Sequence, residues 1–318
     1  MRLRHLASVP GGYTTELAFA ANGELWACAR IGLIELWRND RRQHEIHIPG
    51  HAVGVVRFSD DASLLLAGPF LVNAKDGRLE PLVSILDRLG FDIHAGPLGP
   101  TQMSPQNAVF TPDTKALMVY ARYQPLHNHD ARYHGPQERV VLLAGHTRQP
   151  LAVLWEANGL LNCRLLDATN AHLAAAGMGV RLWSLNPLGL LAEYPSESTP
   201  ISALRFSPDG QQLAYASAVG EMFVRGVADG ASRNWLGDPD GISSLCFSSD
   251  GTRILTGGRK GTLALWANEG EPRQLAVHHL SDSVDSLALA PSGDRLLVAL
   301  GGGRQRIELY EIEDHGAN

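Results

Sequence analysis

The chain has 318 residues, of which 44% are apolar and 19% are charged, and its formal net charge is −6 at pH 7. Such a composition supplies enough apolar side chains for a packed core, so it excludes a chain that stays disordered. The acidic balance disfavours nucleic acid and acidic membranes as partners, because both require a basic surface.

From residue 14 onward the sequence repeats one pattern: a strand of alternating apolar residues, a turn rich in Asp and Gly, and two further strands. The pattern is clearest where ISALRFSPDGQQLAYASAVGEMFVR is followed by ISSLCFSSDGTRILTGGRKGTLALW, at 201–266. The residue that marks the first strand recurs seven times, at Phe19, Phe58, Phe110, Leu166, Phe206, Phe247 and Leu289. Successive positions are 39, 52, 56, 40, 41 and 42 residues apart, and a period near 40 predicts four-stranded propeller blades.

The first repeat covers residues 14–48, and the second runs from His51 to the outer strand RLEPLV. Residues 84–102 then lose the strand alternation, and we expect a helical turn at 85–89 followed by a loop rich in Gly and Pro. The third repeat resumes at Asn107, but residues 122–138 separate its second strand from its third. These two insertions account for the two long steps.

The later repeats are regular, with the outer strands LGLLAEY, RNWLG and RQLAVH. The seventh supplies only three strands, whereas residues 3–9 form a strand pattern without a repeat of their own. We predict that this N-terminal strand becomes the outermost strand of the last blade, which closes the fold and removes an open edge.

The SPDG turn, the third strands ending in Trp37, Trp183, Trp266 and Tyr310, and the period near 40 resemble the WD-repeat β-propellers. Gly50 with His51 resembles the Gly-His pair of that family. The resemblance implies an all-β fold, a single seven-bladed β-propeller over residues 1–318. The Asp that follows the Trp in the family is replaced here, by Arg38, Ser184, Ala267 and Glu311. We therefore expect apolar stacking, rather than the buried His-Ser-Trp-Asp network of the family, to hold the blades.

In propellers of this family, both insertions would leave the same face. We predict that a partner protein binds there, because Tyr, Arg and His are common anchors of interfaces. The candidate partner-binding residues are Phe91, His94, Arg122, Tyr123, His127, Arg132, Tyr133 and His134. Two unrelated surface loops are the simpler alternative, and three histidines in one loop leave a zinc site open.

The innermost strands carry five charged residues: Glu16, Arg57, Arg164, Arg205 and Asp285. They could form a ligand-binding ring at the central channel, but pairing between adjacent blades or hydration is the simpler interpretation. The sequence has no nucleophile elbow or phosphate-binding Gly loop, and residues 301–303 indicate a turn. We predict a non-catalytic interaction scaffold, monomeric or part of a hetero-complex. The alternative is a propeller enzyme, or a protein that binds a small ligand or metal at the channel mouth.

The chain has three scattered cysteines, Cys28, Cys163 and Cys246. Without a C-x-x-C pair they predict buried thiols, so we expect no disulfide, no metal and no cofactor. The N-terminus lacks the apolar segment of a signal peptide, which favours a cytoplasmic location. Only 3 of the 27 basic residues are lysines, a bias typical of bacteria with GC-rich genomes.

Overall fold

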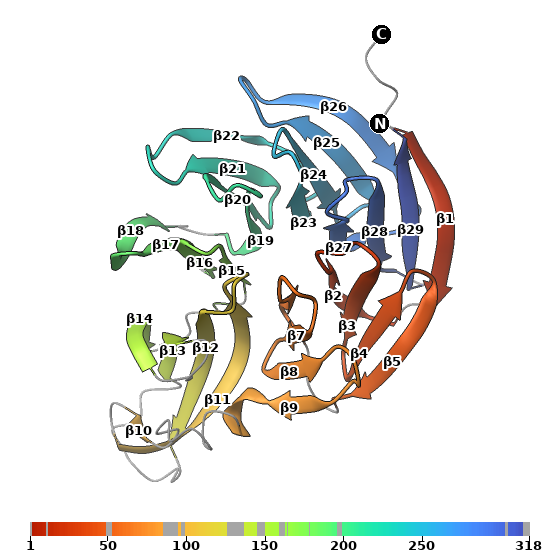
Figure 1. Cartoon of the computed structure of the whole chain (residues 1–318). Helices are drawn as coiled ribbons and strands as arrows, with labels where there is room; N and C mark the ends of the chain where they lie inside the picture. Colours follow the sequence, from red (N-terminus) through yellow and green to blue (C-terminus); the bar gives the residue numbers. More distant parts are fainter. Residues whose placement is uncertain are drawn as a thin grey trace. The chain divides into compact units, whose positions relative to one another are not determined.

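The computed structural model describes residues 2–10, 12–48, 53–84, 95–96, 99–125, 137–144, 150–158, 163, 165–177, 179–195, 199–302 and 305–313. Within them the chain forms seven sheets of strands that are mostly consecutive in sequence (Figure 1). Six sheets have four strands and one has five. The all-β class and the seven-bladed β-propeller are thus confirmed.

The chain divides into two compact units, a first unit of residues 1–52 and 194–318 and a second unit of residues 53–193. The first unit holds four blades. Blade one comprises β2 (Thr14–Phe19), β3 (Leu25–Arg30), β4 (Leu33–Arg38) and β5 (Arg41–His47). Blade five comprises β19 (Ile201–Phe206), β20 (Gln212–Ser217), β21 (Glu221–Gly226) and β22 (Ser232–Leu236). Blade six comprises β23 (Ile242–Phe247), β24 (Arg253–Gly258), β25 (Thr262–Ala267) and β26 (Arg273–His279).

Blade seven joins the two ends of the chain, and it consists of β27 (Val284–Leu289), β28 (Arg295–Leu300), β29 (Arg306–Glu313) and β1 (Arg2–Pro10). β1 runs antiparallel to β29, with one register shift between His5 and Ala7. Leu3 and Val9 of β1 pack against the apolar clusters beside blade seven. The predicted closure by the N-terminal strand is therefore confirmed.

Apolar stacking joins the blades, as expected. Met222 and Val224 of blade five, for example, pack with Ile242, Leu245 and Trp266 of blade six. Blade six keeps the hydrogen bond between Trp and a hydroxyl group that belongs to the family network, because Trp266 Nε1 donates to Thr256 Oγ1 at 3.0 Å.

Buried serines add a polar seam between the innermost strands, which the sequence analysis did not predict. Ser244 Oγ accepts a hydrogen bond from the backbone N of Leu287 at 3.1 Å, and so joins blade six to blade seven. Ser286 Oγ accepts one from the backbone N of Leu17, also at 3.1 Å, and joins blade seven to blade one. Both serines are buried. Stacking between blades is thus supplemented by hydrogen bonds that fix their relative register.

The turn between the first and second strands has the same design in blades two, three, five and six. In blade five, Ser207 Oγ donates to Asp209 Oδ1 at 2.6 Å, and the same oxygen accepts from the backbone N of Gln211 at 3.0 Å. Gly210 takes a positive φ of 69°, which glycine adopts without steric cost. These hydrogen bonds, first that from Ser207, lower the pKa of Asp209.

The second unit holds three blades. Blade two comprises β6 (Val56–Phe58), β7 (Leu64–Ala67), β8 (Phe70–Asn73) and β9 (Leu79–Pro81). Blade three comprises β10 (Ala95–Gly96), β11 (Gly99–Phe110), β12 (Ala116–Pro125), β13 (Gln137–Ala144) and β14 (Pro150–Asn158). Blade four comprises β15 (Leu165–Ala168), β16 (His172–Ala176), β17 (Gly179–Leu185) and β18 (Leu188–Pro195).

Two expectations for the second unit change in detail. Six of the seven marker residues end the first strand of their blade, but β15 ends at Ala168, two residues after Leu166. The strands also reach into both insertions, because β11 begins at Gly99 and β12 continues to Pro125. Residues 82–84 are helical, whereas the helical turn expected at 85–89 lies outside the described residues.

Candidate protein-interaction surface

We call the upper edge of a blade the one where its second strand joins its third and its fourth strand leads to the next blade. In blade three the strands β11 and β12 extend further at this edge than the strands of the other blades. β12 pairs with β13 from Ala116–Ala144 to Tyr123–Gln137, and with β11 as far as Thr101–Pro125. The segment between Pro125 and Gln137 therefore starts from a hydrogen-bonded ladder rather than from a free loop.

Arg122 and Glu138 form a buried ion pair at the base of this insertion. Arg122 Nε donates to Glu138 Oε1 at 2.7 Å, and the side chain of Glu138 is fully buried. Burial, and then Glu138, raise the pKa of Tyr120 on the same ladder. Since a buried carboxylate needs a compensating partner, Arg122 supports the ladder, and its contact with a binding partner stays a prediction.

The other candidate residues are not placed by the structure. Tyr123 is described by its backbone alone, at the upper end of β12. The remaining six lie outside the described residues: Phe91, His94, His127, Arg132, Tyr133 and His134. Their convergence on one face therefore stays a prediction.

The upper edge of the first unit exposes apolar side chains that the sequence analysis missed. In blade one Tyr13 and Ile31 are 60% and 58% exposed, and the backbone N of Ile31 donates to the carbonyl of Tyr13. In blade five Val219 and Leu236 are 49% and 60% exposed. Large apolar residues in connecting turns are the signal that could have revealed them, because a turn buries little of what it carries.

The inner charges are paired, but not between adjacent blades. Arg205 of blade five forms an ion pair with Glu16 of blade one, although β23 and β27 lie between their strands. In the second unit Arg57 of blade two contacts Asp167 of blade four at 3.1 Å. The expected pairing between adjacent blades is thus wrong in its geometry, because these long side chains reach past a neighbouring inner strand. Arg164 lies outside the described residues.

Asp285 differs from these charges because its described hydrogen bond comes from a hydroxyl group, that of Ser283 at 3.1 Å. Burial raises the pKa of its carboxyl. In blades five and six the equivalent residues are Ser202 and Ser243, which donate to backbone carbonyls of the next blade. A carboxyl in such a place is more compatible with its surroundings when it carries a proton.

The cysteines are free thiols in three different blades. Cys28 Sγ donates to Glu35 Oε2 at 3.2 Å, and Glu35 also pairs with Arg30 and Arg42. Burial raises the pKa of Cys246 to about 12, so this thiol stays protonated and unreactive at neutral pH. In the part of the chain that the structure describes, no group of three or more His, Cys, Asp or Glu residues could hold a metal ion. No helix among those residues is long and apolar enough to cross a membrane.

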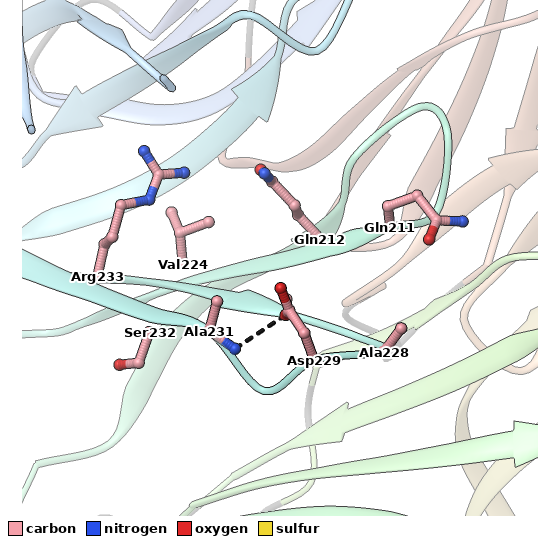
Figure 2. Close-up of a pocket in the computed structure, with 9 residues that line it drawn as sticks. Gln211, Gln212, Val224, Ala228, Asp229, Ala231, Ser232 and Arg233 are labelled. Atoms are coloured by element: carbon pink, nitrogen blue, oxygen red, sulfur yellow. Dashed lines mark hydrogen bonds between the residues drawn. The ribbon is translucent and has the colours of Figure 1, made fainter. Parts of the chain in front are cut away.

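A pocket of about 330 Å³ lies at the lower edge of blade five (Figure 2). Asp229 Oδ1 accepts from the backbone N of Ala231 at 2.9 Å, and Arg233 Nη2 donates to Oδ1 of the buried Asn268 at 2.8 Å. Asn268 in turn donates to Gln212 at 2.7 Å. These polar groups connect blade five to blade six, and the pocket lies away from the inner strands where a channel-mouth ligand would bind.

Seven blades, a long hydrogen-bonded ladder at the upper edge of blade three, and paired inner charges define a β-propeller. The family described as WD domain, G-beta repeat, matches residues 232–267, which cover β22 to β25. Transcription factor unc-37 of Caenorhabditis elegans is 25% identical over 178 residues, which is 53% of this chain and 29% of that protein. Transducin-like enhancer protein 2 of Mus musculus is 30% identical over 169 residues, 50% of this chain and 22% of that protein.

The resemblance to the WD-repeat propellers is thereby confirmed. The matches cover less than a third of the length of either relative. The similarity therefore concerns a part of these proteins, and a bacterial origin of the present chain stays a prediction.

Proposed function

We propose that this protein is a non-catalytic, cytoplasmic platform that binds a partner protein at the upper edges of blades two and three. The observation that carries the proposal is the ladder of β11, β12 and β13, which continues to Tyr123 and Gln137 and is anchored by the buried Arg122–Glu138 pair. Binding segments are commonly displayed on a rigid scaffold of this kind, because pre-ordering reduces the entropy lost on binding. The similarity to WD-repeat proteins supports the same role at a coarser level.

The proposal is tested by removing large side chains from the insertion of blade three. A variant with Tyr123→Ala, Arg132→Ala and Tyr133→Ala should lose roughly thirtyfold or more in affinity for the partner, about 2 kcal/mol. The partner is first identified by capture from the native host and mass spectrometry, and its affinity is then measured by calorimetry.

The matched control removes exposed apolar side chains from the upper edge of the first unit, with Tyr13→Ala and Ile31→Ala. Both variants should melt like the parent, because Tyr13 and Ile31 are exposed and the proposal assigns the three insertion side chains to the partner rather than to a blade interior. If the insertion variant keeps the parental affinity and the control loses it, the binding surface is the upper edge of blade one, and our assignment is wrong.

The alternative function, an enzyme or a protein that binds a small ligand or metal at the channel mouth, has no observation in its favour among the described residues. The charged residues of the innermost strands form ion pairs with one another: Arg205 with Glu16, and Arg57 with Asp167. One equivalent of zinc or calcium, found by elemental analysis of the purified protein, would favour this alternative instead.

A further inference from the structure

Strand β18 forms the outer edge of blade four and carries an unusual side-chain pattern. The strand order in this blade is β15-β16-β17-β18, so the described sheet has no further strand beside β18. Leu188, Leu190 and Leu191 are 42%, 53% and 48% exposed. An edge strand presents backbone N–H and C=O groups to solvent, and an apolar edge is a template on which another strand can pair.

The outer strands of other blades carry features that oppose such pairing. β5 contains Arg41, Arg42 and Glu45, and β26 begins with Arg273. β9 has only three residues. β14 begins with Pro150, and its register shifts twice against β13, which twists the edge. Residues 188–192 contain neither a charge nor a proline, and they carry three exposed leucines, so this stretch of β18 has none of these features.

We propose that β18 pairs antiparallel with β18 of a second copy of this chain, so that the protein forms a two-fold symmetric dimer. Charge complementarity supports a second copy as the occupant. The one charged residue of the strand is Glu193, and Arg181 of β17 already neutralises it, with Arg181 Nη2 2.7 Å from Glu193 Oε1. An apolar, internally neutralised strand therefore matches itself better than it matches a charged segment.

The two-fold axis fixes which side chains meet. With the axis at Leu190, this residue opposes its own copy, Leu188 opposes Ala192 of the copy, and Leu191 opposes Gly189. Glu193 then opposes Pro187. No like charges face each other, and the leucines form the cross-strand apolar pairs that stabilise an antiparallel ladder.

The first experiment measures molar mass by sedimentation over a wide range of protein concentrations. We expect the parent to change from 34.3 kDa to twice that mass as its concentration rises. A variant with Leu190→Lys and Leu191→Lys should stay monomeric throughout, because it places like charges against each other across the axis. The control carries Leu275→Lys and Val277→Lys on β26, where the side chains are 40% and 44% exposed, and it should dimerise like the parent. Circular dichroism shows whether all three proteins are folded.

The second experiment tests the register. Opposed residues of an antiparallel pair lie within disulfide distance, so Leu190→Cys, which meets its own copy on the axis, should give a covalent dimer on mild oxidation. Leu191→Cys, which opposes Gly189 of the copy, and Leu275→Cys should not. A parent that is monomeric at every concentration overturns the proposal and leaves the edge to a strand from another protein. A lysine variant that dimerises like the parent, or equal cross-linking of all cysteine variants, overturns it as well.

Discussion

Blade six and blade three have the same turn at their lower edges, but their strands differ in length at the upper edge. In blade six the strands have six or seven residues, whereas β11 and β12 of blade three have twelve and ten. Yet the lower turns are alike, because Thr111 and Asp113 of blade three repeat the hydroxyl-to-carboxylate bond of Ser248 and Asp250 in blade six. The extra length is therefore confined to the upper edge. The proposed binding surface thus lies where blade three departs from the regular repeat.

The largest expected effect comes from breaking the regular part at its closure. Deleting residues 1–10 removes β1, uncovers β29, and exposes apolar surface that Leu3 and Val9 now cover. We expect a loss of about 5 kcal/mol in the free energy of unfolding, from the lost burial and the unpaired backbone groups. Chemical denaturation measures it. A truncated protein with the parental denaturation midpoint would show that β1 contributes little.

The second effect tests the base of the irregular edge. Arg122→Ala should cost about 3 kcal/mol, because it leaves the buried carboxylate of Glu138 without this partner. The control is Lys260→Ala, which breaks the exposed pair with Asp240 and should leave the stability nearly unchanged. Thermal melting of both variants measures the two losses in stability. Equal small losses would mean that the ion pair contributes little to the stability of this edge.

A third, smaller effect concerns the serine seam. Ser286→Ala should cost about 2 kcal/mol, because the buried backbone N of Leu17 loses its acceptor. Ser8→Ala, at an exposed position of β1, serves as the control and should be nearly neutral. Urea titration compares the two. A neutral Ser286 variant would assign blade stacking to apolar contacts alone.

The smallest effect is a pH dependence. The pKa of Asp285 is raised above its ordinary value near 3.8, so the folded state binds this proton more tightly than the unfolded state does. The stability that it contributes is thus fully present below pH 3.8 and is lost as the pH rises through the folded value. Relative to Asp285→Asn, the parent should lose less than about 1 kcal/mol over this range, because the side chain is only half-buried. A parent that gains stability relative to Asp285→Asn as the pH rises would contradict this assignment.

The sequence predicted what the repeat itself encodes. Phe206 and Phe247 mark the ends of inner strands because an apolar period of two is followed there by a turn that needs Asp and Gly. In blade four the end of the first strand was predicted two residues too early. Leu166 corresponds to Leu204 rather than to Phe206, and both of those positions are apolar in the other blades. The partnership of Arg122 with Glu138 could not be predicted, because it depends on a strand register that forms within the presumed insertion. The hydrogen bonds of Ser244 and Ser286 could not be predicted for a similar reason. From the sequence alone, a serine on an inner strand is a polar residue in an apolar pattern, and its partner lies in the next blade.

The pairing of β1 with β29 also determines the order in which the chain can fold. The two strands are about as far apart in sequence as any in the described chain, so their contact closes a loop of nearly the whole length. Contacts of such long range form late, because loop closure costs entropy before the contact repays it. During synthesis the first strand must remain without its partner until the last one has been made. Blade seven is therefore the last to be completed, and its open edge is where a nascent chain is most exposed to wrong pairing.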